Sequence, residues 1–184
     1  MMDELSLNIL DIAQNSIAAE AAHVGIYVTE NDGDDSLVIR IVDDGRGMSA
    51  EFLAVVQDPF ITTRNTRKIG LGISFLKEAA EMTGGSIDLK STPGVGTEIT
   101  AFFSKSHIDR QPLGDLAGTI VALVTLNPEI DFHFCYTVNG DGFDFTTQEV
   151  REILGDGAEL SSPSVIVFLT EYLDENISNI SGGI

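Results

Sequence analysis

The sequence is poor in the residues that build disulfides and metal centres. It has one cysteine, Cys135, and no tryptophan. A single cysteine forms no internal disulfide and supplies too few thiolates for a structural zinc or iron–sulfur site. No apolar run reaches the roughly 18 residues that a membrane-spanning helix needs. The chain also opens on an acidic helical pattern, not on a basic segment followed by an apolar one. We therefore predict a cytoplasmic protein without a secretory signal.

Positive charge is scarce as well. Ten Lys and Arg residues stand against 29 Asp and Glu residues, which gives a net charge of −19. Such a chain repels nucleic acids and anionic membrane surfaces, so we expect neither as a partner. An anionic ligand would need local compensation, and the one basic cluster is Arg64, Arg67 and Lys68. A solvated surface loop is the alternative interpretation of that cluster.

The hydrophobic pattern of the first hundred residues predicts alternating helices and strands. Asp3 is the expected N-cap of the first helix, and the Asn31-Asp32-Gly33-Asp34 stretch is a hairpin turn signal. Residues 58–70 show no periodicity, so we expect a loop there. The expected helices lie at about 3–20, 49–57 and 72–82, and the expected strands at 23–29, 36–43, 86–91 and 97–103.

A polar stretch at about 104–114 predicts a boundary, and a smaller α/β extension follows it. We expect a helix at 115–126, a hairpin of 131–138 and 143–147, a short helix from 147, a final helix at 163–173 and a frayed tail over 171–184. We interpret Asn139-Gly140 as a tight turn, not a calcium loop, because Phe143 stands where a ligand is needed. The hairpin either extends the main sheet, which we prefer, or offers a strand-addition surface to a partner or to a second copy in a homodimer.

Three polar residues share one stripe of the first helix. Asn8, Asp11 and Asn15 are spaced i, i+3 and i+7 in a segment otherwise rich in Leu and Ile. A solvent-facing stripe is the simple interpretation. The functional interpretation is a magnesium site, in which Asn15 offers an amide oxygen to a cation held mainly by phosphates and water. Asp11, one turn earlier, would then orient a water molecule or accept a proton.

A glycine-rich segment follows the second expected strand. In Asp43-Asp44-Gly45-Arg46-Gly47-Met48, a carboxylate at a strand end suits an exocyclic amino group, which adenine has and guanine lacks at that edge. Gly45 and Gly47 would let the backbone run flat under a planar base. Thr97, after Gly94-Val95-Gly96, would complete an adenine pocket beside Asp43. An ordinary Asp-Gly turn is the alternative interpretation.

A third segment is suited to phosphate. Phe60-Ile61-Thr62-Thr63-Arg64 leads through Lys68 to Gly70-Leu71-Gly72 and a helix. Glycines at a helix N-terminus expose free N–H groups and the positive end of the helix dipole. The neighbouring basic residues would supply the charge that the rest of the chain lacks.

The order of these motifs resembles the ATP-binding domain of sensor histidine kinases, in the superfamily shared with DNA gyrase, the Hsp90 chaperones and MutL. The resemblance covers about residues 5–103. It implies an α+β two-layer sandwich (the Bergerat ATP-binding fold) with a mixed, mainly antiparallel sheet, as a domain of residues 1–104 with the C-terminal extension at 105–184. It also implies ATP and Mg²⁺ between the first helix and a lid at about 58–70. Asn15 would be the magnesium ligand, Asp43 the adenine acceptor and Thr97 its water-bridged helper. The full set of implied nucleotide-binding residues is Asn15, Asp43, Gly45, Gly47, Met48, Phe60, Thr62, Thr63, Arg64, Lys68, Gly70, Leu71, Gly72 and Thr97.

The sequence departs from the sensor-kinase pattern at three places. Lys68 stands at the first of three lid positions that are usually glycine. Asp11 stands where the superfamily's hydrolases have Glu and its sensor kinases usually have Asn or His. Aspartate has the base chemistry of glutamate with a reach shorter by about 1.5 Å. No phosphoacceptor histidine precedes the motifs, since only about seven residues come before the Asn8–Asn15 stripe and none of His23, His107 and His133 has that context.

These features predict a regulatory kinase or ATPase, with Asp11 as its catalytic residue, that acts on a separate, unidentified partner protein. The alternative is a non-catalytic ATP-sensing module whose lid closure regulates partner binding. A structural protein that has lost nucleotide binding is disfavoured, because a decayed site would lack some of these residues.

Overall fold

The computed structural model describes residues 4–57, 71–155 and 159–182. The helices of this part of the chain are α1 (Leu5–Ala18), α2 (Ala50–Gln57), α3 (Leu71–Glu81), α4 (Leu116–Leu126), α5 (Thr147–Leu154) and α6 (Pro163–Ser181). The strands are β1 (His23–Asn31), β2 (Ser36–Asp43), β3 (Ser86–Thr92), β4 (Gly96–Ser104), β5 (Asp131–Val138) and β6 (Asp141–Thr146). No described helix has the length and apolarity to cross a membrane.

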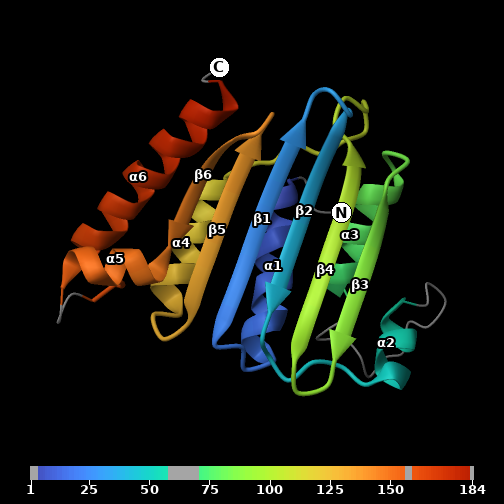
Figure 1. The fold of residues 1–184 in the computed structure, drawn as a ribbon, viewed down its shortest axis with the longest axis horizontal. Coiled ribbons are helices and arrows are strands. Elements are labelled where there is room, and N and C mark those ends of the chain that lie inside the picture. The colour runs from blue at the N-terminus through green and yellow to red at the C-terminus, as the bar shows by residue number, and fades with distance from the viewer. Residues whose placement is uncertain (1–3, 58–70, 156–158, 183–184) are drawn as a thin grey trace.

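The six strands form one sheet in the order β3-β4-β2-β1-β5-β6. Every neighbouring pair is antiparallel except β1 and β5, which run parallel. Helices α1, α3 and α4 lie behind the sheet in Figure 1, and the other face of the sheet is open toward the viewer. The predicted α+β two-layer fold with a mixed, mainly antiparallel sheet is confirmed.

Along the central strands, every second side chain points into the core. Val24, Ile26 and Val28 of β1 are buried against the helices, as are Leu37, Ile39 and Ile41 of β2. On α1 the buried apolar positions recur at helical spacing: Leu5, Ile9 and Ile12. Helix α4 is buried on most of its surface because it lies between α1 and α6.

The C-terminal part of the chain continues the same sheet. β5 pairs with β1 over its whole length, and Phe132, Phe134 and Tyr136 enter the core of the first part. The Tyr136 hydroxyl donates to Glu30 Oε1 at 2.5 Å, and Lys105 Nζ lies 2.9 Å from Glu30 Oε2. Burial and this hydrogen bond raise the pKa of Tyr136 well above its usual range. Through these two polar contacts at Glu30, the three side chains link β1, β5 and the segment after β4.

Two local predictions about the helix ends were wrong. Glu4, not Asp3, precedes the first helical residue, and its side chain makes no capping hydrogen bond; Asp3 lies outside the described residues. The tail is not frayed from residue 171. α6 continues to Ser181 because Leu173 is fully buried and Ile177 and Ile180 pack on the core, and Gly182 ends it in the left-handed conformation.

The turn between β5 and β6 is the tight turn that the sequence predicts. Asn139 and Gly140 have φ values of 52° and 93°, as a two-residue hairpin turn requires. The Asn139 side chain also accepts from the Asp32 N–H at 2.8 Å and donates to the Asp32 carboxylate at 2.7 Å. The two hairpin turns at this end of the sheet are thereby joined, and the calcium-loop alternative does not apply.

The division at residue 104 stays a prediction, and the continuous core makes it testable. We expect Leu173→Ala to lower the free energy of unfolding by about 2–5 kcal/mol, because a fully buried leucine is truncated. Urea unfolding, followed by far-UV circular dichroism and by tyrosine fluorescence, should show one coincident transition for the whole chain. Leu126→Ala, at a position 78% exposed, is the matched control with little effect. Two separate transitions would mean that the extension unfolds independently.

Candidate nucleotide-binding site

The carboxylate of Asp43 is fixed at the end of β2 by two hydrogen bonds. Ser16 Oγ of α1 donates to Asp43 Oδ2 at 2.7 Å, and the Gly45 N–H donates to Asp43 Oδ1 at 3.0 Å. Since a carboxylate accepts up to about four hydrogen bonds, both oxygens keep acceptor capacity. Ser16 was not among the predicted site residues, although it lies next to Asn15 on the same helix. The Asp43 side chain is therefore held in one orientation before any ligand arrives.

Gly45 and Gly47 allow the loop after β2 to approach two other elements closely. A Cβ atom at Gly45 would lie 2.8 Å from the carbonyl oxygen of Ala19, and one at Gly47 would overlap the Thr92 carbonyl. Gly47 also has a φ of 66°, a value that favours glycine. The Arg46 N–H donates to Ala19 O at 2.9 Å. In the structure, the glycines thus bring the loop against the end of α1 and against the β3–β4 turn.

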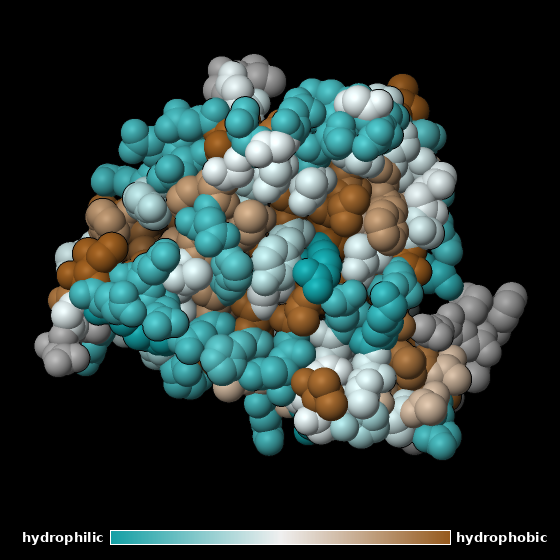
Figure 2. Space-filling view, viewed as in Figure 1, coloured by the Kyte–Doolittle hydropathy of each residue, from teal (hydrophilic) through white to brown (hydrophobic). Residues whose placement is uncertain are grey.

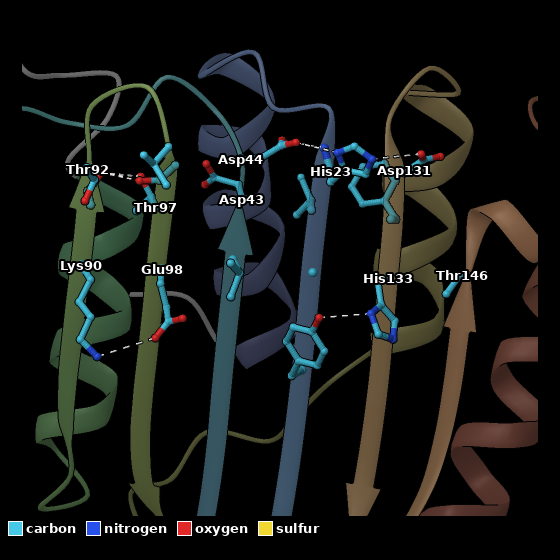
Figure 3. Close-up of a pocket in the computed structure, with 18 of the residues that line it drawn as sticks. His23, Asp43, Asp44, Lys90, Thr92, Thr97, Glu98, Asp131, His133 and Thr146 are labelled. Carbon is cyan, nitrogen blue, oxygen red and sulfur yellow. Dashed lines mark hydrogen bonds and ion pairs between the residues drawn. The ribbon is translucent and has the colours of Figure 1, made fainter.

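Thr97 lies directly across from Asp43, as its cross-strand partner on β4. Its hydroxyl is 2.9 Å from Ser91 Oγ, which also accepts from the Met48 N–H at 2.8 Å. Ser91, another residue that the sequence analysis missed, thereby joins the glycine loop to Thr97. Figure 3 shows Asp43 and Thr97 side by side at the ends of their strands. The sequence prediction that these two residues meet is consistent with this geometry.

A pocket of about 230 Å³ opens between α1, the end of the sheet and the segment after β2. Its walls are mostly apolar, and Asp43 and Thr97 lie at its sheet side. None of the apolar wall residues except Met48 was predicted, because their side chains carry no chemistry that a motif would show. The lining residues are Ile12, Asn15, Ser16, Ala18, Ala19, Asp43, Arg46, Gly47, Met48, Ser49, Phe52, Ile73, Thr97 and Ile99.

The polar stripe of α1 divides into a buried residue and a half-buried pair. Asn8 is completely buried, so a solvent-facing stripe is wrong at that position. Asp11 and Asn15 are half-buried and lie beside the first turn of α3. A Cβ atom built on Gly72 would be 3.4 Å from Asp11 Oδ2 and 3.7 Å from Asn15 Nδ2. Gly72 therefore lets the α3 N-terminus approach the two polar side chains.

The remaining predicted ligand-binding residues fall mostly outside the part of the chain that the structure describes. These are Phe60, Thr62, Thr63, Arg64, Lys68 and Gly70. Leu71 is the first residue of α3. The described part of the site therefore consists of Asp11, Asn15 and Gly72 at one end and the Asp43–Met48 loop with Thr97 at the other.

A second, larger hollow of about 690 Å³ lies on the open face of the sheet, and Asp43 and Thr97 line both hollows. Figure 3 shows Asp44 turned away from Asp43 toward His23, which in turn faces Asp131 of β5. His23 Nδ1 is 2.6 Å from Asp44 Oδ2, and Nε2 is 3.5 Å from Asp131 Oδ2. Asp44 Oδ1 also accepts from the backbone N–H groups of Ala22 and His23, both at 2.8 Å. The residue after Asp43 is thus tied to β1.

The two-layer arrangement is the fold of a MutL ATPase domain. The structure of the Aquifex aeolicus MutL ATPase domain complexed with ADP superposes with a TM-score of 0.54, at 14% identity, over 94% of this chain and 70% of that one. Residues 1–107 match the family model of the histidine kinase-, DNA gyrase B- and HSP90-like ATPases, and the chain belongs to this ATP-binding family.

The sequence relatives include sensor histidine kinases. Sensor histidine kinase ZraS of Escherichia coli K12 is 29% identical over 112 residues, which are 61% of this chain and 24% of ZraS. Sporulation kinase D of Bacillus subtilis is 32% identical over 98 residues, which are 53% of this chain and 19% of that kinase. The chain thus spans a quarter or less of the length of these relatives.

The contact between His23 and Asp44 predicts the direction in which the pKa of His23 is shifted. The hydrogen bond to Asp44 raises the pKa of His23 above 6.5, burial opposes the increase, and the negative charges of Asp44 and Asp131 add to it. Since the protonated form is favoured, the contact stabilises the fold below pH 6.5, and this contribution is lost as the pH rises through the folded-state pKa. NMR of the imidazole protons should give a midpoint above 6.5 that falls in Asp44→Asn and is unchanged in Asp88→Asn. A wild-type midpoint at or below 6.5 would contradict the contact.

Proposed function

We propose that this protein binds ATP with Mg²⁺ in the pocket between α1 and the end of the sheet, and that it is a regulatory kinase or ATPase acting on a separate protein. The observation that carries the proposal is the fixed carboxylate of Asp43 at the rim of an apolar pocket. Family membership supports ATP as the ligand class. The roles of the individual residues are our inference from their positions.

The pocket suits the adenine base. A planar heterocycle is desolvated favourably by walls such as Ile12, Met48 and Ile99, and Asp43 supplies an acceptor for its exocyclic amino group. Guanine presents a carbonyl oxygen at that edge, and two acceptors facing each other repel. Thr97, hydrogen-bonded to Ser91, supports the adenine edge directly or through water. This arrangement favours ATP over GTP.

The α1–α3 contact suits the phosphates and the cation. The N-terminus of α3 presents the positive end of the helix dipole, which stabilises phosphate. Asn15 beside this turn would give Mg²⁺ one amide oxygen. The described residues contain no group of three or more His, Cys, Asp or Glu side chains able to hold a metal. Phosphate oxygens and water would therefore supply the other ligands, as Mg²⁺ commonly accepts.

We infer that Asp11 acts on water. Its carboxylate lies one helical turn from Asn15 and next to Gly72, close to where the α3 N-terminus would hold phosphate. There it can orient a water molecule or take its proton. The reach of Asp, shorter than that of Glu by about 1.5 Å, favours slow hydrolysis. The same short reach favours the second candidate, an ATP-sensing module without turnover whose lid closure regulates partner binding.

Calorimetric titration with Mg-ATP, Mg-GTP and Mg-ADP tests the site. We expect binding of the adenine nucleotides, weaker binding of GTP, and a loss of about 1.5–3 kcal/mol in Asp43→Asn, roughly ten- to hundredfold in Kd. The loss arises because an amide can present its own NH₂ group to the adenine amino group. Asp88→Asn, a carboxylate on β3 paired with Lys90, should bind ATP as the wild type does. Absence of wild-type binding at millimolar ATP would refute the proposal.

ATP turnover separates the two candidate functions. If Asp11 acts on water, Asp11→Asn should lower the rate of phosphate release by about 10²–10⁴-fold and change the Kd for ATP only slightly. A coupled phosphate-release assay measures the rate, and the titration above measures the Kd. Wild-type hydrolysis that survives Asp11→Asn would remove Asp11 from the catalytic role. Tight ATP binding with neither hydrolysis nor transfer of the terminal phosphate in the wild type would favour the sensing module.

A further inference from the structure

The layer of helices extends further than the sheet at one side of the molecule. β6 is the last strand in the sheet, and no described strand pairs with its outer edge. α6 lies beyond β6 in Figure 1 and packs on α4, β5 and β6. A strand edge presents unpaired backbone N–H and C=O groups. α6 therefore borders the outer edge of β6, and a further strand added at this edge would partly cover the helix.

The flank of α6 nearest β6 carries two exposed aromatic rings. Phe168 is 48% exposed and Tyr172 is 40% exposed, and their rings stack at a centroid distance of 5.8 Å and an interplanar angle of 14°. The Tyr172 ring also meets Phe143 of β6 edge-on, with centroids 5.6 Å apart. This contact places the aromatic pair at the strand edge. Figure 2 shows apolar side chains on the surface at this side of the molecule, over α5 and α6.

The charge around this edge is almost entirely negative. From residue 111 to residue 184, Arg151 is the only Lys or Arg, against twelve Asp and Glu residues. Arg151 is itself paired with Asp131. Glu171 and Glu175 lie on the exposed side of α6 near the two rings, and neither has an ion-pair partner within the described ranges. The edge thus combines apolar surface with uncompensated negative charge.

The opposite edge of the sheet, formed by β3, has features that discourage the addition of a strand. β3 carries Lys90, which lies 2.7 Å from Asp88 Oδ2 and 3.8 Å from Glu98 Oε1. A lysine on an edge strand discourages the addition of another strand, because its charge and long side chain must be accommodated. α2 also contacts β3. β6 carries no basic residue.

We propose that the β6 edge, together with Phe168 and Tyr172, binds an extended, cationic segment of a partner protein as a seventh strand. Backbone groups of the segment would pair with β6, and its apolar side chains, at alternate positions, would cover the two rings. Its Lys or Arg side chains would face Glu171 and Glu175. A second copy of this chain is the wrong occupant, because two β6 edges would bring together like charges such as Asp141 and Asp144, and each chain carries −19.

A designed peptide of four Val-Lys repeats, labelled with a fluorophore, tests this site on the full chain. We expect it to bind at least tenfold tighter than the matched Val-Glu peptide, as measured by fluorescence anisotropy. N-methylation of alternate backbone nitrogens should abolish binding, because it removes the donors of one peptide edge and keeps the side chains and charge. Hydrogen exchange of β6 amides should slow when the unmodified peptide is bound.

Variants of the protein locate the contact. We expect Phe168→Ser combined with Tyr172→Ser to weaken peptide binding at least tenfold. Ile108→Ser, at a side chain 93% exposed between β4 and α4, should not change it. Circular dichroism and ATP titration check that each variant folds, since neither ring lies in the nucleotide pocket.

Three results would overturn the proposal. The first is equal binding of the N-methylated peptide, or unchanged binding by the double variant. Either outcome would show that the acidic protein attracts any cation. The second is no binding at millimolar peptide. The third is concentration-dependent dimerisation in analytical ultracentrifugation that the double variant abolishes, which would make a second copy the occupant.

Discussion

The 2.7 Å hydrogen bond from Ser16 to Asp43 joins the two layers at the point where the proposed chemistry takes place. α1 packs its apolar stripe on the sheet, so its position is set by the core. The same helix carries Asp11, Asn15 and Ser16 on the side that meets α3 and the end of β2. The core therefore keeps the site rigid. Asp43 cannot turn without breaking its hydrogen bond to α1, and hydrophobic packing holds α1 in place.

The parallel pairing of β1 with β5 gives the C-terminal part of the chain a direct connection to this site. β1 is the neighbour of β2, whose last residue is Asp43, and β5 lies on its other side. His23 at the start of β1 faces both Asp44 and Asp131. Arg151 of α5 pairs with Asp131 in turn. A series of contacts between charged or titratable side chains therefore connects α5 to Asp44, the residue that follows the proposed adenine acceptor.

The features that the sequence predicts well are those with a local cause. Alternating apolar residues define β1 and β2, Asn139-Gly140 defines its turn, and the Ser49 hydroxyl accepts from the Phe52 N–H at the start of α2. The Asp43–Thr97 pair was found because both residues belong to motifs of a family with a common fold. These predictions depend on segments of a few residues, or on a motif order that many related chains share.

The features that escaped prediction depend on contacts between distant segments. Ser16 and Ser91 carry no motif and gain a role only when α1 and β3 approach the glycine loop. The burial of Asn8 follows from packing around α1, and a polar residue at helical spacing looks the same whether it faces water or protein. α6 extends past residue 173 because Leu173 finds a place in the core, which propensity in an acidic tail does not reveal.

Asp43 and Thr97 line both the pocket beneath the sheet and the wider hollow on its open face. The wall between the two spaces is therefore a single layer of side chains at this point. A molecule bound on the open face of the sheet would therefore lie close to Asp43 and Thr97. A charge placed there would interact with the Asp43 carboxylate at short range, with no movement of a strand. Residues that line the proposed nucleotide pocket therefore also form part of the outer surface of the sheet.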